Sequence, residues 1–125
     1  MKHISFDPRF VNAAGNDLIQ GKIHTIRQNF FFWKRFEGKE VALFNWEGKP
    51  YQPGSKHKVF CVKRIVSVQG IFYDTFFSSK KQDNFIAPCE LAKNDGFENS
   101  DDLFLWFSNY KPGKMAILHF TDFRY

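Results

Sequence analysis

The sequence predicts an α+β domain in which a mostly antiparallel sheet curls into a β-barrel with flanking helices. The expected order along the chain is a strand, a helix, several strands, two helices and a final strand, which is typical of this class. The strands are short and rich in aromatic residues, and such strands favour a curled sheet over an open one. The 125 residues contain no internal repeat or linker, which predicts one domain over residues 1–125.

A short strand and a helix are expected at the start of the chain. Residues 4–6 form the strand. Asp7 followed by Pro8 is a typical helix start, because a carboxylate accepts from free amides and proline at the first position loses no hydrogen bond. Apolar side chains then recur every three or four positions as far as about Gln20, which predicts one apolar helix face. Gly21 is the expected end of this helix.

Strands dominate the middle of the chain, where the apolar period changes to two from His24 onward. Residues 28–36 mix aromatic rings with cations, and their pattern fits either a loop or a short helix. Turn residues separate the strand segments that follow. The expected strands cover residues 40–46, 56–68 and 70–77, and a polar loop is expected over residues 78–84.

Two helices and a strand complete the expected domain. The first helix is short and covers residues 87–92. Asn99 or Ser100 then caps a second helix, whose apolar side chains as far as Tyr110 share one face. The last strand is expected over residues 115–123, after a turn that contains proline and glycine.

The charge of the chain is positive and unevenly distributed. The net charge is +5 at pH 7. Residues 1–81 carry 14 Lys and Arg against 6 Asp and Glu, whereas residues 82–125 carry 4 against 7. A basic region of this kind fits a polyanionic partner. The same lysines also fit a simpler role, which is to keep a chain with 17 phenylalanines in solution.

The segment from Gly21 to Arg27 carries the clearest functional signal, because Lys22, Thr25 and Arg27 lie where the first helix gives way to a strand. It resembles the G-K-x-x-T-x-R signature of the ASCH domain, a branch of the PUA-like β-barrels. Weaker similarities lie at residues 46–48, 94–97, 101–110 and 118–123. The resemblance spans nearly the whole chain and implies a PUA-like barrel that binds RNA or a modified nucleoside or nucleotide.

Within the same superfamily, small bacterial amidohydrolases that remove the acetyl group from N4-acetylcytidine are similar to this chain. This similarity implies a catalytic set of Lys22, Thr25 and Asp95, with aspartate where these enzymes usually have glutamate. A threonine hydroxyl needs a base before it attacks, and a lysine is a base only when burial or a cation such as Arg27 lowers its pKa. A carboxylate can then pass protons to the departing amine.

Further candidates for ligand binding lie beside this set. His24 lies inside the signature and is a candidate for the pocket lining, although strand alternation directs Thr25 and Arg27 to the opposite face. Trp33, Lys34 and Arg35 combine a ring with two cations, which is the mixture that stacks an unpaired base and neutralises its phosphate. Most of the other rings nearby are expected in the core.

Other classes of function leave no pattern in the sequence. The histidines lack metal-ligand spacing, the two cysteines form no C-x-x-C pair, and no glycine-rich loop cradles a phosphate. We therefore expect no metal and no cofactor. No run of eighteen apolar residues and no signal-peptide core is present, so we expect no membrane partner and a cytoplasmic location. The oligomeric state is left open.

Three hypotheses follow for the function. The first is an RNA-binding or nucleoside-binding module with a basic, aromatic-edged cleft around Lys22, Thr25 and Arg27. The second is an amidohydrolase of acylated nucleosides, in which Thr25 is the nucleophile, Lys22 its base and Asp95 the acid. The third is a structural or protein-binding domain, which the many phenylalanines permit if some are exposed.

Overall fold

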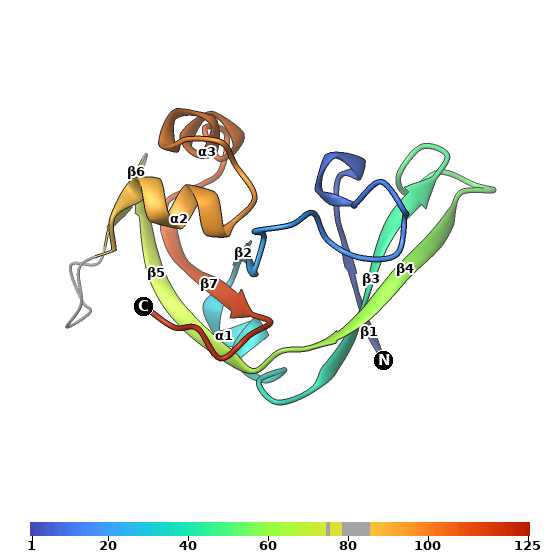
Figure 1. Cartoon of the computed structure of the whole chain (residues 1–125), viewed down its shortest axis with the longest axis horizontal. Helices are drawn as coiled ribbons and strands as arrows, with labels where there is room; N and C mark the ends of the chain where they lie inside the picture. The colour runs from blue at the N-terminus through green and yellow to red at the C-terminus, as the bar shows by residue number, and fades with distance from the viewer. Residues whose placement is uncertain (75, 79–85) are drawn as a thin grey trace.

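The computed structural model describes residues 1–74, 76–78 and 86–125, and the polar loop expected over residues 78–84 lies outside these ranges except at its first residue. Helices and strands appear in the expected order (Figure 1). The elements are β1 (Lys2–Ser5), the 3-10 turn η1 (Pro8–Phe10), β2 (His24–Gln28), α1 (Phe30–Lys34), β3 (Glu40–Glu47), β4 (Lys56–Arg64), β5 (Ser67–Asp74), β6 (Phe76–Ser78), α2 (Pro88–Asn94), α3 (Ser100–Trp106) and β7 (Gly113–His119).

The strands form two sheets, which Figure 1 shows as the arms of a V. One sheet has the order β1-β3-β4 and the other the order β2-β7-β5-β6. Among the described strands, β1 and β3 pair in parallel, and the other pairs are antiparallel. The arms meet where β4 passes into β5 through the fully buried Ile65. The α+β class and the mostly antiparallel pairing are therefore confirmed.

The expected closed barrel is not found, because no strand ladder joins the two sheets within the described residues. Side chains and loops connect them instead. Arg27 on β2 donates from Nη2 to the main-chain oxygen of Ser5 on β1, at 2.6 Å. The segment between β1 and β2 contains η1 and a series of turns. The structure thus shows two sheets in an α+β fold, without a closed barrel among the described residues.

The helix expected from Asp7 to Gln20 is wrong beyond its first turn. Asp7 does cap η1, accepting from the Arg9 amide at 2.9 Å, but the helical turn ends at Phe10. Asn12 then accepts from the backbone of the following turn, and Gly15 takes a positive φ of 72°. Asparagine side chains that bond nearby amides compete with helix, and glycine removes the steric cost of leaving it. Local turn chemistry therefore outweighs the apolar spacing.

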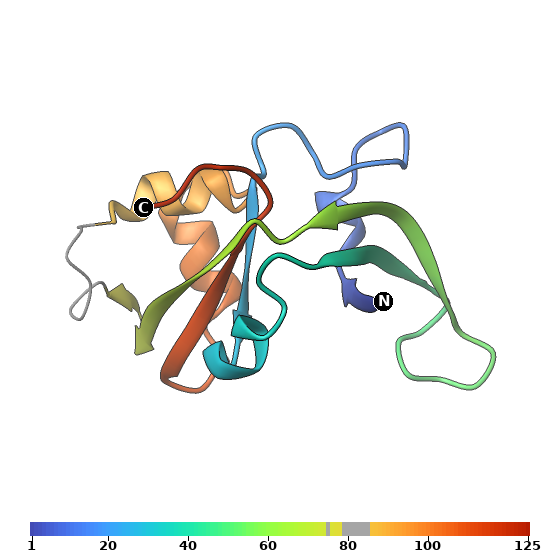
Figure 2. The same ribbon diagram turned by 90° about the horizontal axis from the view of Figure 1, so that it is seen from below.

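The C-terminal half follows the expected order closely. Asn99 caps α3, because its side chain accepts from the Asp102 amide at 2.9 Å. The aromatic segment between β2 and β3, for which loop and helix were both open, contains the short helix α1. Figure 2 shows α2 at one end of the molecule and the β3–β4 hairpin at the opposite end.

The core lies between the inner faces of the two sheets and under α2 and α3. Several of its side chains are completely shielded from solvent, and they come from both sheets and from both helices. They include Val41, Leu43, Ile65, Leu103, Ile117 and Leu118. In the part of the chain that the structure describes, no helix is long and apolar enough to cross a bilayer.

Candidate functional site

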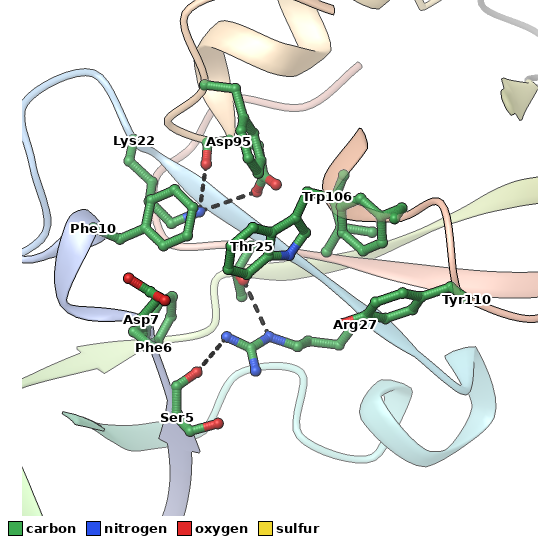
Figure 3. Close-up of a pocket in the computed structure, with 13 residues that line it drawn as sticks. Ser5, Phe6, Asp7, Phe10, Lys22, Thr25, Arg27, Asp95, Trp106 and Tyr110 are labelled. Carbon is green, nitrogen blue, oxygen red and sulfur yellow. Dashed lines mark hydrogen bonds and ion pairs between the residues drawn. The ribbon is translucent and has the colours of Figure 1, made fainter. Parts of the chain in front are cut away.

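A pocket of about 180 Å³ opens between the two arms of the fold (Figure 3). The end of β1 and η1 form one wall, β2 forms the back, and the residues after α2 and at and after the end of α3 form the other wall. The lining combines aromatic rings with cationic, hydroxyl and carboxylate groups. Among its residues are Phe6, Phe10, Lys22, Thr25, Arg27, Asp95, Trp106 and Tyr110.

Lys22 lies in the turn before β2, so strand alternation does not direct its side chain away from Thr25. Its Nζ donates to the main-chain oxygen of Asp95 at 2.6 Å and to Asp95 Oδ1 at 3.2 Å. The Nζ also lies 4.5 Å from the centre of the Phe10 ring. Burial lowers the pKa of Lys22, while the neighbouring Asp95 acts in the opposite direction. The amine is therefore fixed in position and largely removed from water.

Gly96 allows the chain after α2 to approach Lys22 this closely. Its φ is +91°, and a Cβ at this position would lie only 3.0 Å from Lys22 Cδ and 3.1 Å from Phe10 Cδ1. A larger residue would meet both the conformational cost of positive φ and these two contacts. Gly96 thus sets the distance between Asp95 and Lys22 through the backbone.

Asp95 ends α2 and is held from two sides. Its Oδ1 accepts from Lys22 Nζ and lies 3.2 Å from His24 Nδ1. Because a carboxylate oxygen only accepts, we assign a hydrogen of the His24 ring to Nδ1, which donates to Asp95 Oδ1. The other carboxylate oxygen, Oδ2, has no hydrogen-bond partner among the described residues and remains available to a ligand. Asp95 therefore points out of its own turn and into the pocket.

His24 lies behind Asp95, in the core rather than in the pocket lining. Its Nε2 is hydrogen-bonded to the Tyr125 hydroxyl at 2.7 Å, and the same hydroxyl accepts from Asn94 Nδ2 at 3.0 Å. Burial raises the pKa of Tyr125, so this phenol stays protonated and remains a donor. His24 is thus a group that orients the Asp95 carboxylate.

Thr25 and Arg27 extend from β2 to the same face, as the period of two predicts. Arg27 Nε donates to Thr25 Oγ1 at 3.1 Å, which leaves the hydroxyl hydrogen for a ligand. The guanidinium carbon lies 4.8 Å from the centre of the Phe6 ring. Burial lowers the pKa of Arg27, but a guanidinium starts so high that it keeps its charge. The pocket therefore contains a fixed positive charge.

The proposed base and nucleophile face the same pocket without touching. The hydrogen bonds of Lys22 Nζ go to Asp95, and none joins it to Thr25 Oγ1, although the structure describes both groups. Deprotonation of Thr25 by Lys22 would need a shift of the lysine side chain when a substrate binds. The geometry of the pocket fits ligand binding without such a shift.

The structure places the three residues expected to stack a base outside the pocket lining. Lys34 forms an exposed ion pair with Glu37 at 2.9 Å. Arg35 lies over the Phe32 ring at 4.8 Å, and Trp33 packs against the core. Figure 1 places α1 at the base of the V, away from the mouth between the arms. Lys34 and Arg35 therefore contact neighbouring residues of their own segment and do not line the pocket.

The aromatic walls of the pocket come from residues that the sequence did not single out for binding. Phe6 and Phe10 face Trp106 and Tyr110 across the pocket. Trp106 also packs edge-on against Phe10, with ring centres 5.5 Å apart. The one available signal was the shared face of the helix that ends near Tyr110, which contains Trp106.

Comparison with known proteins adds no relative. No family model matches the chain, and none of the curated proteins and none of the solved structures matches it significantly. Within the described residues, no three His, Cys, Asp or Glu side chains gather as a metal site. The assignment of function therefore depends on the chemistry of the pocket and on the motif that lines it.

Proposed function

We propose that the protein is an RNA-binding or modified-nucleoside-binding domain of the ASCH type, which holds one unpaired base in the pocket between β1, β2 and α3. One observation carries this proposal: Lys22, Thr25, Arg27 and Asp95 all line a single aromatic-walled pocket. The resemblance of the segment from Gly21 to Arg27 to the ASCH signature supports it independently.

The shape and chemistry of the pocket suit a base. A nucleobase is flat, and the partly exposed rings of Trp106 and Tyr110 offer faces on which it can stack. Its edge carries donors and acceptors that match the Thr25 hydroxyl and the free oxygen of Asp95. The volume of about 180 Å³ is smaller than the roughly 300–1,000 Å³ of pockets for drug-sized ligands. A single base fits this space better than a larger ligand does.

Replacing Arg27 with alanine is expected to weaken binding by about 10- to 150-fold, since hydrogen bonds to a charged group contribute roughly 1.5–3 kcal/mol. Fluorescence anisotropy with a labelled single-stranded oligoribonucleotide measures the change. Arg35→Ala is the matched control, because Arg35 is an arginine outside the pocket lining. Thermal unfolding of each variant checks that the fold is kept. Equal affinity of Arg27→Ala and the unchanged protein would contradict the proposal.

A second candidate is hydrolysis of the amide of an acylated nucleoside such as N4-acetylcytidine. The observation that favours it is that Lys22, Thr25 and Asp95 face the same pocket. In this reaction Thr25 Oγ1 attacks the acyl carbon while neutral Lys22 takes the hydroxyl proton. The carbon–nitrogen bond breaks as the proton passes to the leaving amine through the Lys22 and Asp95 pair. Water then hydrolyses the acyl ester on Thr25 and releases acetate.

Thr25→Ala is expected to stop release of cytidine from N4-acetylcytidine, because no other residue in this mechanism can form the acyl ester. Chromatography of the nucleosides measures turnover. Thr25→Ser is the control, since it keeps the hydroxyl and should retain part of the activity. If Thr25→Ala still releases cytidine, the proposed mechanism is wrong. If the unchanged protein releases no cytidine, hydrolysis is excluded and ligand binding is the remaining function.

A further inference from the structure

A row of aromatic rings runs along the β3–β4 hairpin, outside the core. The ring of Tyr51 lies 5.0 Å from that of Trp46, and the Trp46 ring lies 4.5 Å from His57. His3 on β1 continues the row, 5.2 Å from His57. We refer to Tyr51, Trp46, His57 and His3 as the ring row. Figures 1 and 2 show the hairpin that carries it projecting at one end of the molecule.

The ring row begins beside the pocket. Arg27 donates to the main-chain oxygen of Ser5, and Ser5 pairs in register with Phe44 on β3. The Phe44 ring lies 5.4 Å from that of Trp46, which in turn contacts Tyr51. A chain of contacts therefore leads from the guanidinium in the pocket to the exposed rings.

Packing of the core does not explain these rings. Tyr51 is 86% exposed, and His3 and His57 are exposed as well. Tyr51 also has a φ of 59°, a left-handed conformation that residues other than glycine seldom adopt. The loop thus presents a large ring to solvent from an unfavourable backbone conformation. Exposed aromatic side chains in an ordered row are typical of a binding surface.

Positive charge surrounds the ring row. Lys49, Lys56 and Lys58 are exposed on the same hairpin, and none of them forms an ion pair within the described residues. Residues 44–60 contain these three lysines and a single acidic residue, Glu47, which pairs in register with Lys56. Rings that stack bases and cations that contact phosphates are the combination by which proteins hold single-stranded nucleic acid.

We propose that the β3–β4 hairpin binds the nucleotides next to the base held in the pocket, so that the ligand is a segment of single-stranded RNA rather than a free nucleoside. This inference rests on the proposed function of the pocket. RNA is the partner that fits, because its loops, bulges and ends present unpaired bases that can be splayed and stacked on rings. The neighbouring base stacks on Tyr51, and the three lysines contact the phosphates.

The test compares free N4-acetylcytidine and cytidine with labelled five-nucleotide RNAs that carry the same nucleosides at the centre. The protein is expected to bind the five-nucleotide RNA at least tenfold more tightly than the matching nucleoside. Tyr51→Ala should weaken RNA binding by about 5- to 150-fold, the range measured for loss of a stacked base, and leave nucleoside binding unchanged. Tyr51→Phe keeps the ring and should keep most of the affinity.

Two further variants sharpen the test. Phe31→Ala removes a ring on α1 that is 72% exposed but lies outside the ring row, so it should bind RNA as the unchanged protein does. Replacing Lys49, Lys56 and Lys58 together with glutamine should reduce the dependence of the RNA affinity on salt, because fewer counterions are released. An unchanged salt dependence would overturn the role of the lysines.

The outcomes separate this inference from the function of the pocket. If the nucleosides bind but the RNA binds no tighter, or if Tyr51→Ala has no effect on RNA, the hairpin surface is overturned and the pocket function stands. If neither nucleoside nor RNA binds, or if Arg27→Ala leaves the RNA affinity unchanged, the proposed function of the pocket is contradicted. If single-stranded DNA of the same sequence binds as tightly as the RNA, or more tightly, the assignment to RNA is overturned.

Discussion

Replacing Lys22 with methionine is expected to lower the free energy of unfolding by about 3–5 kcal/mol, the usual loss when one member of a buried ion pair is removed. The side chains of Lys22 and Asp95 are only 2% and 4% exposed. Methionine fills nearly the same space as lysine without its charge. The substitution therefore leaves the Asp95 carboxylate desolvated, and among the described residues His24 is its one remaining side-chain donor.

Urea unfolding in a double-mutant cycle measures this effect. Lys22→Met combined with Asp95→Asn should recover much of the loss, because asparagine carries no charge and still accepts from His24. The matched control is Lys34→Met, which breaks the exposed pair with Glu37 and should cost less than about 1 kcal/mol. A loss for Lys22→Met as small as that for Lys34→Met would show that the pocket pair is solvated.

His119 is expected to make the stability of the protein fall as the solution is acidified. Burial, with smaller contributions from His24 and Arg124, lowers the pKa of His119 from 6.5 to about 3. Between these two values the unfolded chain binds a proton on His119 that the folded protein does not. The free energy of unfolding therefore falls on going from pH 6.5 towards pH 3, by at most about 1.4 kcal/mol per pH unit from this group.

The geometry explains why His119 stays neutral in the folded protein. Its Nε2 donates to Gln69 Oε1 at 3.0 Å, while its Nδ1 is buried without a hydrogen-bond partner among the described residues. Protonation would place a charged N–H at Nδ1, where no acceptor is available. The nearest other titratable rings are those of His24 and Tyr125, with centres 5.4 and 5.8 Å away. Among the described residues, no carboxylate forms a hydrogen bond or ion pair with His119.

Unfolding in urea at several pH values between 4 and 7 measures the slope. His119→Leu should flatten the pH dependence in this window by the share that His119 contributes, while Gln69 Oε1 still accepts from the Tyr125 amide. Leu118→Ala is the control on the same strand, since it removes buried apolar surface and should lower stability equally at every pH. The same slope in His119→Leu and in the unchanged protein would contradict the prediction.

The parts of the site that depend on local order were predictable from the sequence. The period of two correctly separated Thr25 and Arg27 from His24, because alternation is a property of the strand itself. The motif also identified Lys22 as part of the same site. Asp95 came only from the family resemblance, since nothing in its own turn shows that it reaches Lys22 across 73 positions.

The remaining features depend on how distant segments pack. Trp106 and Tyr110 read as one apolar helix face, and only the tertiary fold turns part of that face into a pocket wall. Tyr51 lies between turn residues, so its role beside Trp46 has no local pattern. The missing barrel also depends on tertiary packing, because the residue pattern does not show that Arg27 contacts β1 through a side-chain hydrogen bond while no ladder joins the two sheets in the described residues.

The walls of the pocket come from residues 5–10, 22–27 and 95–110, so the pocket exists only when the first and last parts of the chain are folded together. The unfolded chain cannot bind a ligand of this site, and occupancy must therefore raise the melting temperature of the whole domain. At a concentration 100 times the dissociation constant the gain is about 2.7 kcal/mol. Thermal-shift screening of nucleosides and oligonucleotides can thus find the ligand before any reaction is known.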